Sequence, residues 1–139
     1  MISDYLLHLK HAIESECNSV KIHFEDLPTQ NAILLICIGN DENSKPVLKA
    51  RQMCETLFGK YTSSLEFRGI SSYASETEGM RGYFGIFLAT HEYSTIAHEA
   101  FHTTHRIMDH IGMKFDINNH EVFAYLNGHI VGCVDKLIS

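Results

Sequence analysis

The order of helical and strand patterns in this chain predicts an α+β fold, a small mixed β-sheet with helices packed on it. The pattern rests on an apolar strand run at 32–38, alternating strands around it, and two consecutive amphipathic helices at the end. The expected order is α-β-β-α-β-β-α-α. At 139 residues the chain supports one hydrophobic core. We therefore expect a single domain over 1–139, with an N-terminal α-β-β-α portion (1–60) and edge strands plus a helix pair (61–139).

The first portion alternates between the helical and the strand period. An amphipathic helix is expected over 3–16, with Ser3 as its N-cap. Residues 20–24 alternate in polarity like a half-exposed strand, whereas 32–38 is apolar throughout, as in a strand buried on both faces. Helical periodicity returns over 44–58, where a proline lies in the first turn and a glycine follows the last.

Two further strands are expected before the helix pair. Residues 64–68 alternate like a strand, and 69–79 has the Ser- and Glu-rich composition of a polar loop. Residues 81–89 read as a strand with internal glycines, Gly82 and Gly85. Glycines inside a strand often mark a place where another part of the chain comes close.

The helix pair is the clearest periodic feature. Apolar residues recur at three- and four-residue steps over 93–111, which predicts a helix with one stripe facing the core. Its stripe includes Ala97 and Phe101. A last helix is expected over about 118–137. Gly128 and Gly132 lie in its interior, where each costs up to about 1 kcal/mol relative to alanine, so we expect them to allow a close approach of the two helices.

The first of these helices carries the pattern H-E-x-x-H at His98, Glu99 and His102. Residues four apart lie on one helix face, so both imidazoles can reach one metal ion. Glu99 projects about 100° around the helix, where its carboxylate can hold a water bound to that ion. The pattern fixes only three positions, and it also occurs by chance on helices that bind no metal.

A catalytic zinc site usually has three protein ligands and one open position, so the histidine pair needs a partner. Glu121 is our candidate, because the 18 residues between His102 and Glu121 suffice for two antiparallel helices with a tight connection. The expected centre is one Zn²⁺ held by His98, His102 and Glu121, with Glu99 free as general base. Glu121 also has a structural reading, since Asn118-x-x-Glu121 is close to a capping box.

These motifs resemble those of the gluzincin metallopeptidases, the thermolysin and aminopeptidase group, in which H-E-x-x-H is followed by an acidic ligand. The run from Asn119 to Ala124 is similar to the Asn-Glu-x-Phe-Ala run around the third ligand in the aminopeptidase branch, with one residue inserted. The resemblance covers about residues 80–135. It implies a minimal zincin of the kind carried by small bacterial and phage proteins, and it implies that 81–89 is the edge strand that pairs with an extended substrate.

The chain also departs from related patterns. The metzincin extension is missing, because His105 stands where its glycine would be and Met108 where its third histidine would be. Tyr125 replaces the aspartate that follows the third ligand in thermolysin. Since the sequence ends about one helix after Glu121, we expect the other cleft wall to be missing or supplied by a second subunit. In the second case the protein would be a homo-oligomer.

The resemblance implies hydrolysis of a peptide or protein substrate. In this hypothesis Glu99 takes a proton from the attacking water and delivers it to the leaving amine. Zinc and Tyr125, or a nearby histidine, would stabilise the oxyanion. The alternative for Tyr125 is that its side chain only packs against its neighbours, as tyrosines commonly do. The catalytic residues we name are therefore Glu99 and Tyr125.

Three alternatives remain open. The main one is a catalytically silent zincin-like module that binds metal, or a partner, without hydrolysing anything. A second uses the two histidines and the carboxylate as a facial iron site. A third is a metal-free scaffold in which His98 and His102 are ordinary surface residues.

Composition narrows the partners and the compartment. The net charge of −6 disfavours nucleic acid, and no apolar run has the roughly 20 residues that span a bilayer, so we expect no membrane partner. The four cysteines are far apart without a C-x-x-C pair, which is typical of isolated thiols in a reducing cytoplasm and not of a thiolate zinc site. His91, His110, His120 and His129 are expected to be non-ligands, with His120 as the first exception to consider, whereas His105, one turn beyond His102, could line the site or substitute as a ligand.

Overall fold

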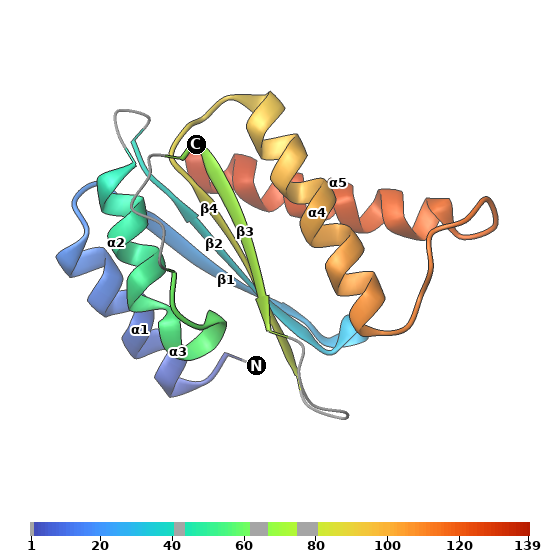
Figure 1. The fold of residues 1–139 in the computed structure, drawn as a ribbon, viewed down its shortest axis with the longest axis horizontal. Coiled ribbons are helices and arrows are strands. Elements are labelled where there is room, and N and C mark those ends of the chain that lie inside the picture. The colour runs from blue at the N-terminus through green and yellow to red at the C-terminus, as the bar shows by residue number, and fades with distance from the viewer. Residues whose placement is uncertain (1, 41–43, 62–66, 75–80) are drawn as a thin grey trace.

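The computed structural model describes residues 2–40, 44–61, 67–74 and 81–139 (Figure 1). Its elements in chain order are α1 (Asp4–Glu16), β1 (Lys21–Leu27), the short helix η1 (Pro28–Gln30), β2 (Ala32–Ile38), α2 (Lys45–Met53), α3 (Glu55–Phe58), β3 (Gly69–Ala74), β4 (Gly82–Leu88), α4 (Tyr93–His110) and α5 (His120–Ile138). The predicted α+β class is confirmed. The helix expected over 44–58 is broken at Cys54 into α2 and α3.

The four strands form one mixed sheet in the order β1-β2-β4-β3. The central strands β2 and β4 are parallel, β1 runs antiparallel to β2, and β3 runs antiparallel to β4. Within the described residues, β1 and β3 are the two edges of this sheet. In this described part of the chain, each therefore has one side on which its backbone is not paired with another strand.

Helices cover both faces of the sheet (Figure 1). The helices α1, α2 and α3 lie on one face, and α4 and α5 lie on the other. All seven residues of β2 are buried, because alternate side chains enter the two cores. Leu34 and Ile36 pack toward α4 and α5, whereas Leu35 and Cys37 pack toward α1 and α2.

The edge strand differs from the one expected. Gly69–Ala74 is strand β3, although its polar composition predicted a loop, and Gly82–Leu88 is an inner strand between β2 and β3. The assignment of 81–89 as the edge strand is therefore wrong. Of the strand expected over 64–68, residues 64–66 lie outside the described residues, and Phe67 and Arg68 are not in a strand.

Glycines confirm one expectation and contradict another. A Cβ at Gly85 would lie 2.8 Å from the ring of Phe58, and one at Gly82 would lie 3.0 Å from the ring of His110, so other parts of the chain come close to β4 at both glycines. A Cβ at Gly128 or Gly132 would meet nothing within 4 Å. The glycines of α5 therefore do not serve a close approach of the two last helices.

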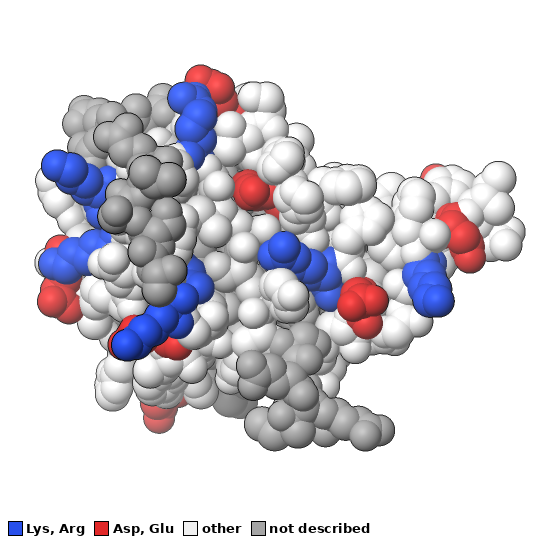
Figure 2. All heavy atoms as spheres, in the orientation of Figure 1, with Lys and Arg blue, Asp and Glu red and all other residues white. Residues whose placement is uncertain are grey.

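The surface is mixed in charge. Figure 2 shows acidic and basic side chains interspersed over the face that carries β3 and α4, without a continuous basic patch among the residues described on this face. In the described part of the chain, no helix combines the length and apolar character that a bilayer-spanning segment needs.

Candidate functional site

The helix α4 forms where periodicity predicts it, and it holds the histidine pair at its middle. Ile96, Ala100 and Ile107 anchor it on the sheet, whereas Ala97 and Phe101, expected in the buried stripe, are exposed. The exposed imidazoles of His98 and His102 stand one turn apart, and a hydrogen bond joins their Nε2 atoms at 3.2 Å. Two nitrogens bound to one tetrahedral zinc at about 2.0 Å are about 3.3 Å apart. The pair is thus spaced for one ion.

Glu99 points inward from the same turn. It is 6% exposed, and its Oε2 atom is buried without a hydrogen-bond partner among the residues that the structure describes. A Cβ at Gly69 would lie 2.9 Å from Cγ of Glu99, so the start of β3 is pressed against this carboxylate. One turn further along α4, Oγ1 of Thr103 is also buried, and it too has no partner in the described part of the chain. Such orphaned polar atoms are rare in folded proteins and call for a ligand, a water or a catalytic role.

Two cavities flank the histidine pair along β3. One, of about 330 Å³, contains His98 and Glu99 and is lined also by Arg68, Gly69, Ser94 and Thr95. The other, of about 470 Å³, lies on the His102 side and includes Tyr73, Arg106, Phe115 and Phe123. Because β3 contributes to both, a chain lying along this edge of the sheet would pass the imidazoles.

Arg106 fixes α4 against this edge strand. Its guanidinium donates to the carbonyl of Ser71 at 3.2 Å and lies 4.5 Å from the ring centroid of Tyr73. At the other end, Arg68 forms an ion pair with Glu92, just before α4 begins. The edge strand and the motif helix are therefore held together by polar contacts at both ends of the site.

The structure does not bring the predicted third ligand to the pair. The side chain of Glu121 is 69% exposed on the first turn of α5, and its Oε1 atom lies 3.6 Å from Nε2 of His120. Among the described residues, no group of three ligand atoms within 4.8 Å of one another includes His98 and His102. Tyr125, the predicted oxyanion donor, is 77% exposed on the next turn. The first turns of α5 project away from the sheet (Figure 1).

His105, the alternative ligand, belongs to an aromatic cluster. Its ring centroid lies 4.4 Å from that of Phe101, 5.1 Å from that of Phe123 and 5.3 Å from that of Phe115. This cluster, with the hydrogen bond from Thr104 to Asn127 (3.2 Å), sets where α5 crosses α4. His105 therefore packs the helix pair together.

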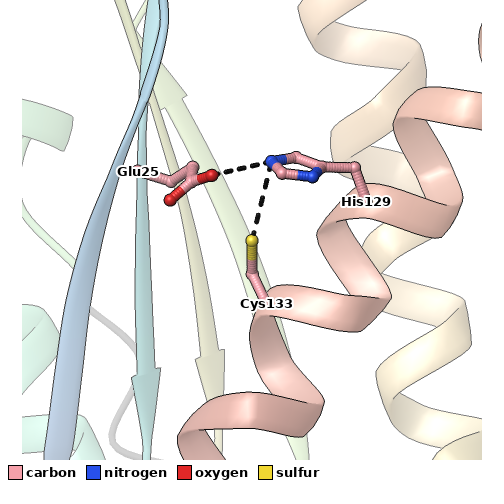
Figure 3. Close-up of side chains that lie close together, drawn as sticks. All are labelled: Glu25, His129 and Cys133. Atoms are coloured by element: carbon pink, nitrogen blue, oxygen red, sulfur yellow. Dashed lines mark hydrogen bonds and ion pairs between the residues drawn. The ribbon is translucent and has the colours of Figure 1, made fainter.

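A second group of metal-binding side chains lies on the other edge of the sheet (Figure 3). Glu25 comes from β1, and His129 and Cys133 stand one turn apart on α5 and point toward it. Oε2 of Glu25 accepts a hydrogen bond from Nε2 of His129 at 2.7 Å, and Sγ of Cys133 lies 3.7 Å from that nitrogen. All three ligand atoms are within 4.8 Å of one another, so this cluster could hold a metal ion.

The pKa values in this cluster reflect burial and the shared hydrogen bonds. Burial acts to raise the pKa of Glu25, but hydrogen bonds from His23 and His129 outweigh it, so the pKa is lowered. Burial, and then the nearby Glu25 carboxylate, raise the pKa of Cys133 to about 11, against the effect of Lys136. The carboxylate is therefore ionised at neutral pH, whereas the thiol carries its proton.

The sequence interpretation missed this second group. Cys17, Cys37 and Cys54 are buried core residues as expected, whereas Cys133 is half-buried and its thiol lies beside two other side chains that can bind metal. His129 and Cys133 have the same four-residue spacing as His98 and His102. That four-residue spacing on a predicted helix was the sequence feature from which this second pair could have been found.

Comparison with models of known protein families, with curated proteins and with solved structures finds no match for this chain.

Proposed function

We propose that this chain is a zinc-dependent peptidase whose metal is held on α4 by His98 and His102. The observation that carries the proposal is the 3.2 Å separation of the two Nε2 atoms, which fits one tetrahedral zinc ion. Oε2 of Glu99 on the same turn, which is buried and has no hydrogen-bond partner within the described ranges, adds a candidate base.

The two imidazoles fit zinc, because histidine nitrogens are common ligands of this ion. Zinc at this position would supply a Lewis acid that polarises the scissile carbonyl and makes water acidic near neutral pH. Glu99 accepts a proton from the attacking water as the new C–O bond forms. It then returns that proton to the amine nitrogen as the C–N bond breaks.

Glu121 stays our prediction for the third ligand, and its coordination would require the start of α5 to move. Its carboxylate is exposed on the first turn of α5, beyond the connection at 111–119. Coordination requires that this first turn swing toward α4, while the crossing at Thr104 and Asn127 stays in place. The free energy of a new charge-to-metal bond would favour that movement.

The substrate we propose is an extended peptide lying along β3. Within the described residues this strand pairs with β4 on one side only, so its other edge offers unpaired backbone groups. The two cavities along β3 lie on either side of the histidine pair and can receive side chains of such a peptide. An added strand would hold a scissile bond near Glu99, because Gly69 is pressed against that residue.

Peptide hydrolysis before and after metal removal tests this proposal. We expect wild-type protein to cleave members of a peptide mixture, to lose cleavage after chelation, and to recover it with zinc. A His98→Gln/His102→Gln variant should show no cleavage above background. A control variant, His8→Gln on exposed turns of α1, should behave as wild type. Cleavage that survives chelation or the double substitution would remove α4 as the catalytic site.

A metal-binding module without hydrolysis is the second candidate, and the exposed position of Glu121 favours it. It predicts zinc bound by His98 and His102 with no cleavage of any peptide in the mixture. For either function we propose a reducing cytoplasm as the compartment, because all four cysteines are free thiols.

A further inference from the structure

We propose that Glu25, His129 and Cys133 hold a second zinc ion, which fastens the C-terminal half of α5 to the edge strand β1. This inference does not depend on hydrolysis or on any metal at α4. It assigns a structural role to three side chains that the proposed peptidase does not use.

The interatomic distances fit a shared ion. Zinc bonds of about 2.3 Å to sulfur and 2.0 Å to nitrogen place those two atoms about 3.5 Å apart in a tetrahedral site. Sγ of Cys133 and Nε2 of His129 are 3.7 Å apart. The carboxylate oxygen of Glu25 is closer to the same nitrogen, at 2.7 Å, because a hydrogen bond joins them. An ion that replaces that proton needs only a small separation of the two groups.

The two helical ligands share one face of α5, as residues four apart do. They border a cavity of about 400 Å³ whose lining also includes Gly132, Lys136 and His23. A side chain at Gly132 would stand at this cavity, where at present a Cβ would meet nothing within 4 Å. There is accordingly room for an ion and for a water as fourth ligand.

His23 completes the site from outside. Its Nε2 atom lies 2.9 Å from Oε1 of Glu25, which leaves Oε2 directed to His129 and the ion. Partners of this kind fix the orientation of a metal-binding carboxylate, and losing one commonly lowers metal affinity about 10- to 100-fold.

The donor set selects zinc over the common hard cations. Calcium and magnesium take oxygen ligands, whereas sulfur and imidazole together suit zinc. A purely polar contact between α5 and β1 would gain little from a thiol, because the S–H group is a weak hydrogen-bond donor. As a metal ligand the same sulfur contributes a strong bond once its proton is lost.

Cobalt titration of the full-length His98→Gln/His102→Gln protein tests this site alone, because the α4 histidines are absent. Cobalt is a spectroscopic substitute for zinc, and a thiolate ligand gives it a sulfur-to-metal charge-transfer band in the near ultraviolet. We expect one equivalent of cobalt to produce this band and one equivalent of zinc to abolish it. Adding Cys133→Ser should eliminate the band, and adding His23→Ala should weaken binding about 10- to 100-fold.

Thermal unfolding of the same His98→Gln/His102→Gln protein tests whether zinc bound at this cluster stabilises the fold. Zinc should raise Tm in the parent protein and leave Tm unchanged after Cys133→Ser, while both proteins melt alike in chelator. A further control, His8→Gln, should retain both the band and the zinc-dependent Tm. A missing charge-transfer band, or a band that persists after Cys133→Ser, would overturn the assignment.

Discussion

Replacing Glu99 with glutamine is expected to lower kcat/KM for peptide hydrolysis by about 10²- to 10⁴-fold, the usual contribution of a general base. Glutamine keeps the shape of the side chain but cannot accept and return a proton. The imidazoles of His98 and His102 are unchanged, so zinc should still bind with wild-type stoichiometry. Steady-state cleavage of a peptide substrate, together with metal analysis of the same samples, measures both parts of this expectation.

The matched control for that variant is Glu14→Gln, which changes an exposed carboxylate on α1. It should leave cleavage and metal content unaltered. If Glu99→Gln cleaved as fast as wild type with zinc bound, Glu99 would not be the base. Loss of both zinc and cleavage would instead show that its carboxylate is needed to build the metal site.

Raising the pH above 9 is expected to destabilise the folded protein through the buried thiol of Cys54. Burial raises the pKa of Cys54 from 9.0 to about 12. The unfolded chain therefore loses this proton at lower pH than the folded chain, and stability present below pH 9 is lost as pH rises toward 12. With those two values the loss from this thiol is about 3 kcal/mol by pH 11.

Chemical denaturation at pH 8 and pH 11 measures this effect, and Cys54→Ala isolates it. That variant should lose less of its free energy of unfolding between the two pH values than wild type does. Val47→Ala is the control, because it trims the same buried cluster without removing an ionisable group. Equal pH dependence in Cys54→Ala and wild type would assign the alkaline loss to other groups.

Elements whose apolar pattern is locally complete could be predicted from the sequence. The strand at 32–38 and the helix at 93–110 have the expected bounds to within one residue, because their side chains repeat with the period of the element. The strand β3, with the sequence Gly-Ile-Ser-Ser-Tyr-Ala, has no such pattern. Its backbone is extended because it pairs with β4, which is a tertiary cause that composition does not reveal.

The two groups of metal-binding side chains differ in the same way, because one is set by a local sequence pattern and the other depends on tertiary packing. His98 and His102 lie four residues apart on one helix, so their convergence could be predicted from the sequence. The spacing of His129 and Cys133 is equally local, but Glu25 lies 104 residues before His129 and meets it only through the packing of α5 beside β1. No local pattern connects those positions.

The position of Glu121 depends on how α4 and α5 cross. The sequence separation from His102 permits a return to the pair, but packing decides where the helix starts. His105 and Phe123, with ring centroids 5.1 Å apart, hold the crossing toward the C-terminal half of α4. The first turn of α5 then projects beyond the sheet (Figure 1), which leaves the carboxylate exposed.

A crystal structure of zinc-loaded protein, with anomalous scattering measured at the zinc edge, tests the peptidase site most directly. We predict an anomalous peak about 2.0 to 2.1 Å from both Nε2 atoms of His98 and His102, with the carboxylate of Glu121 as third protein ligand. A fully zinc-loaded crystal with no peak at these imidazoles, whether or not one appears beside Cys133, would contradict a metal centre on α4.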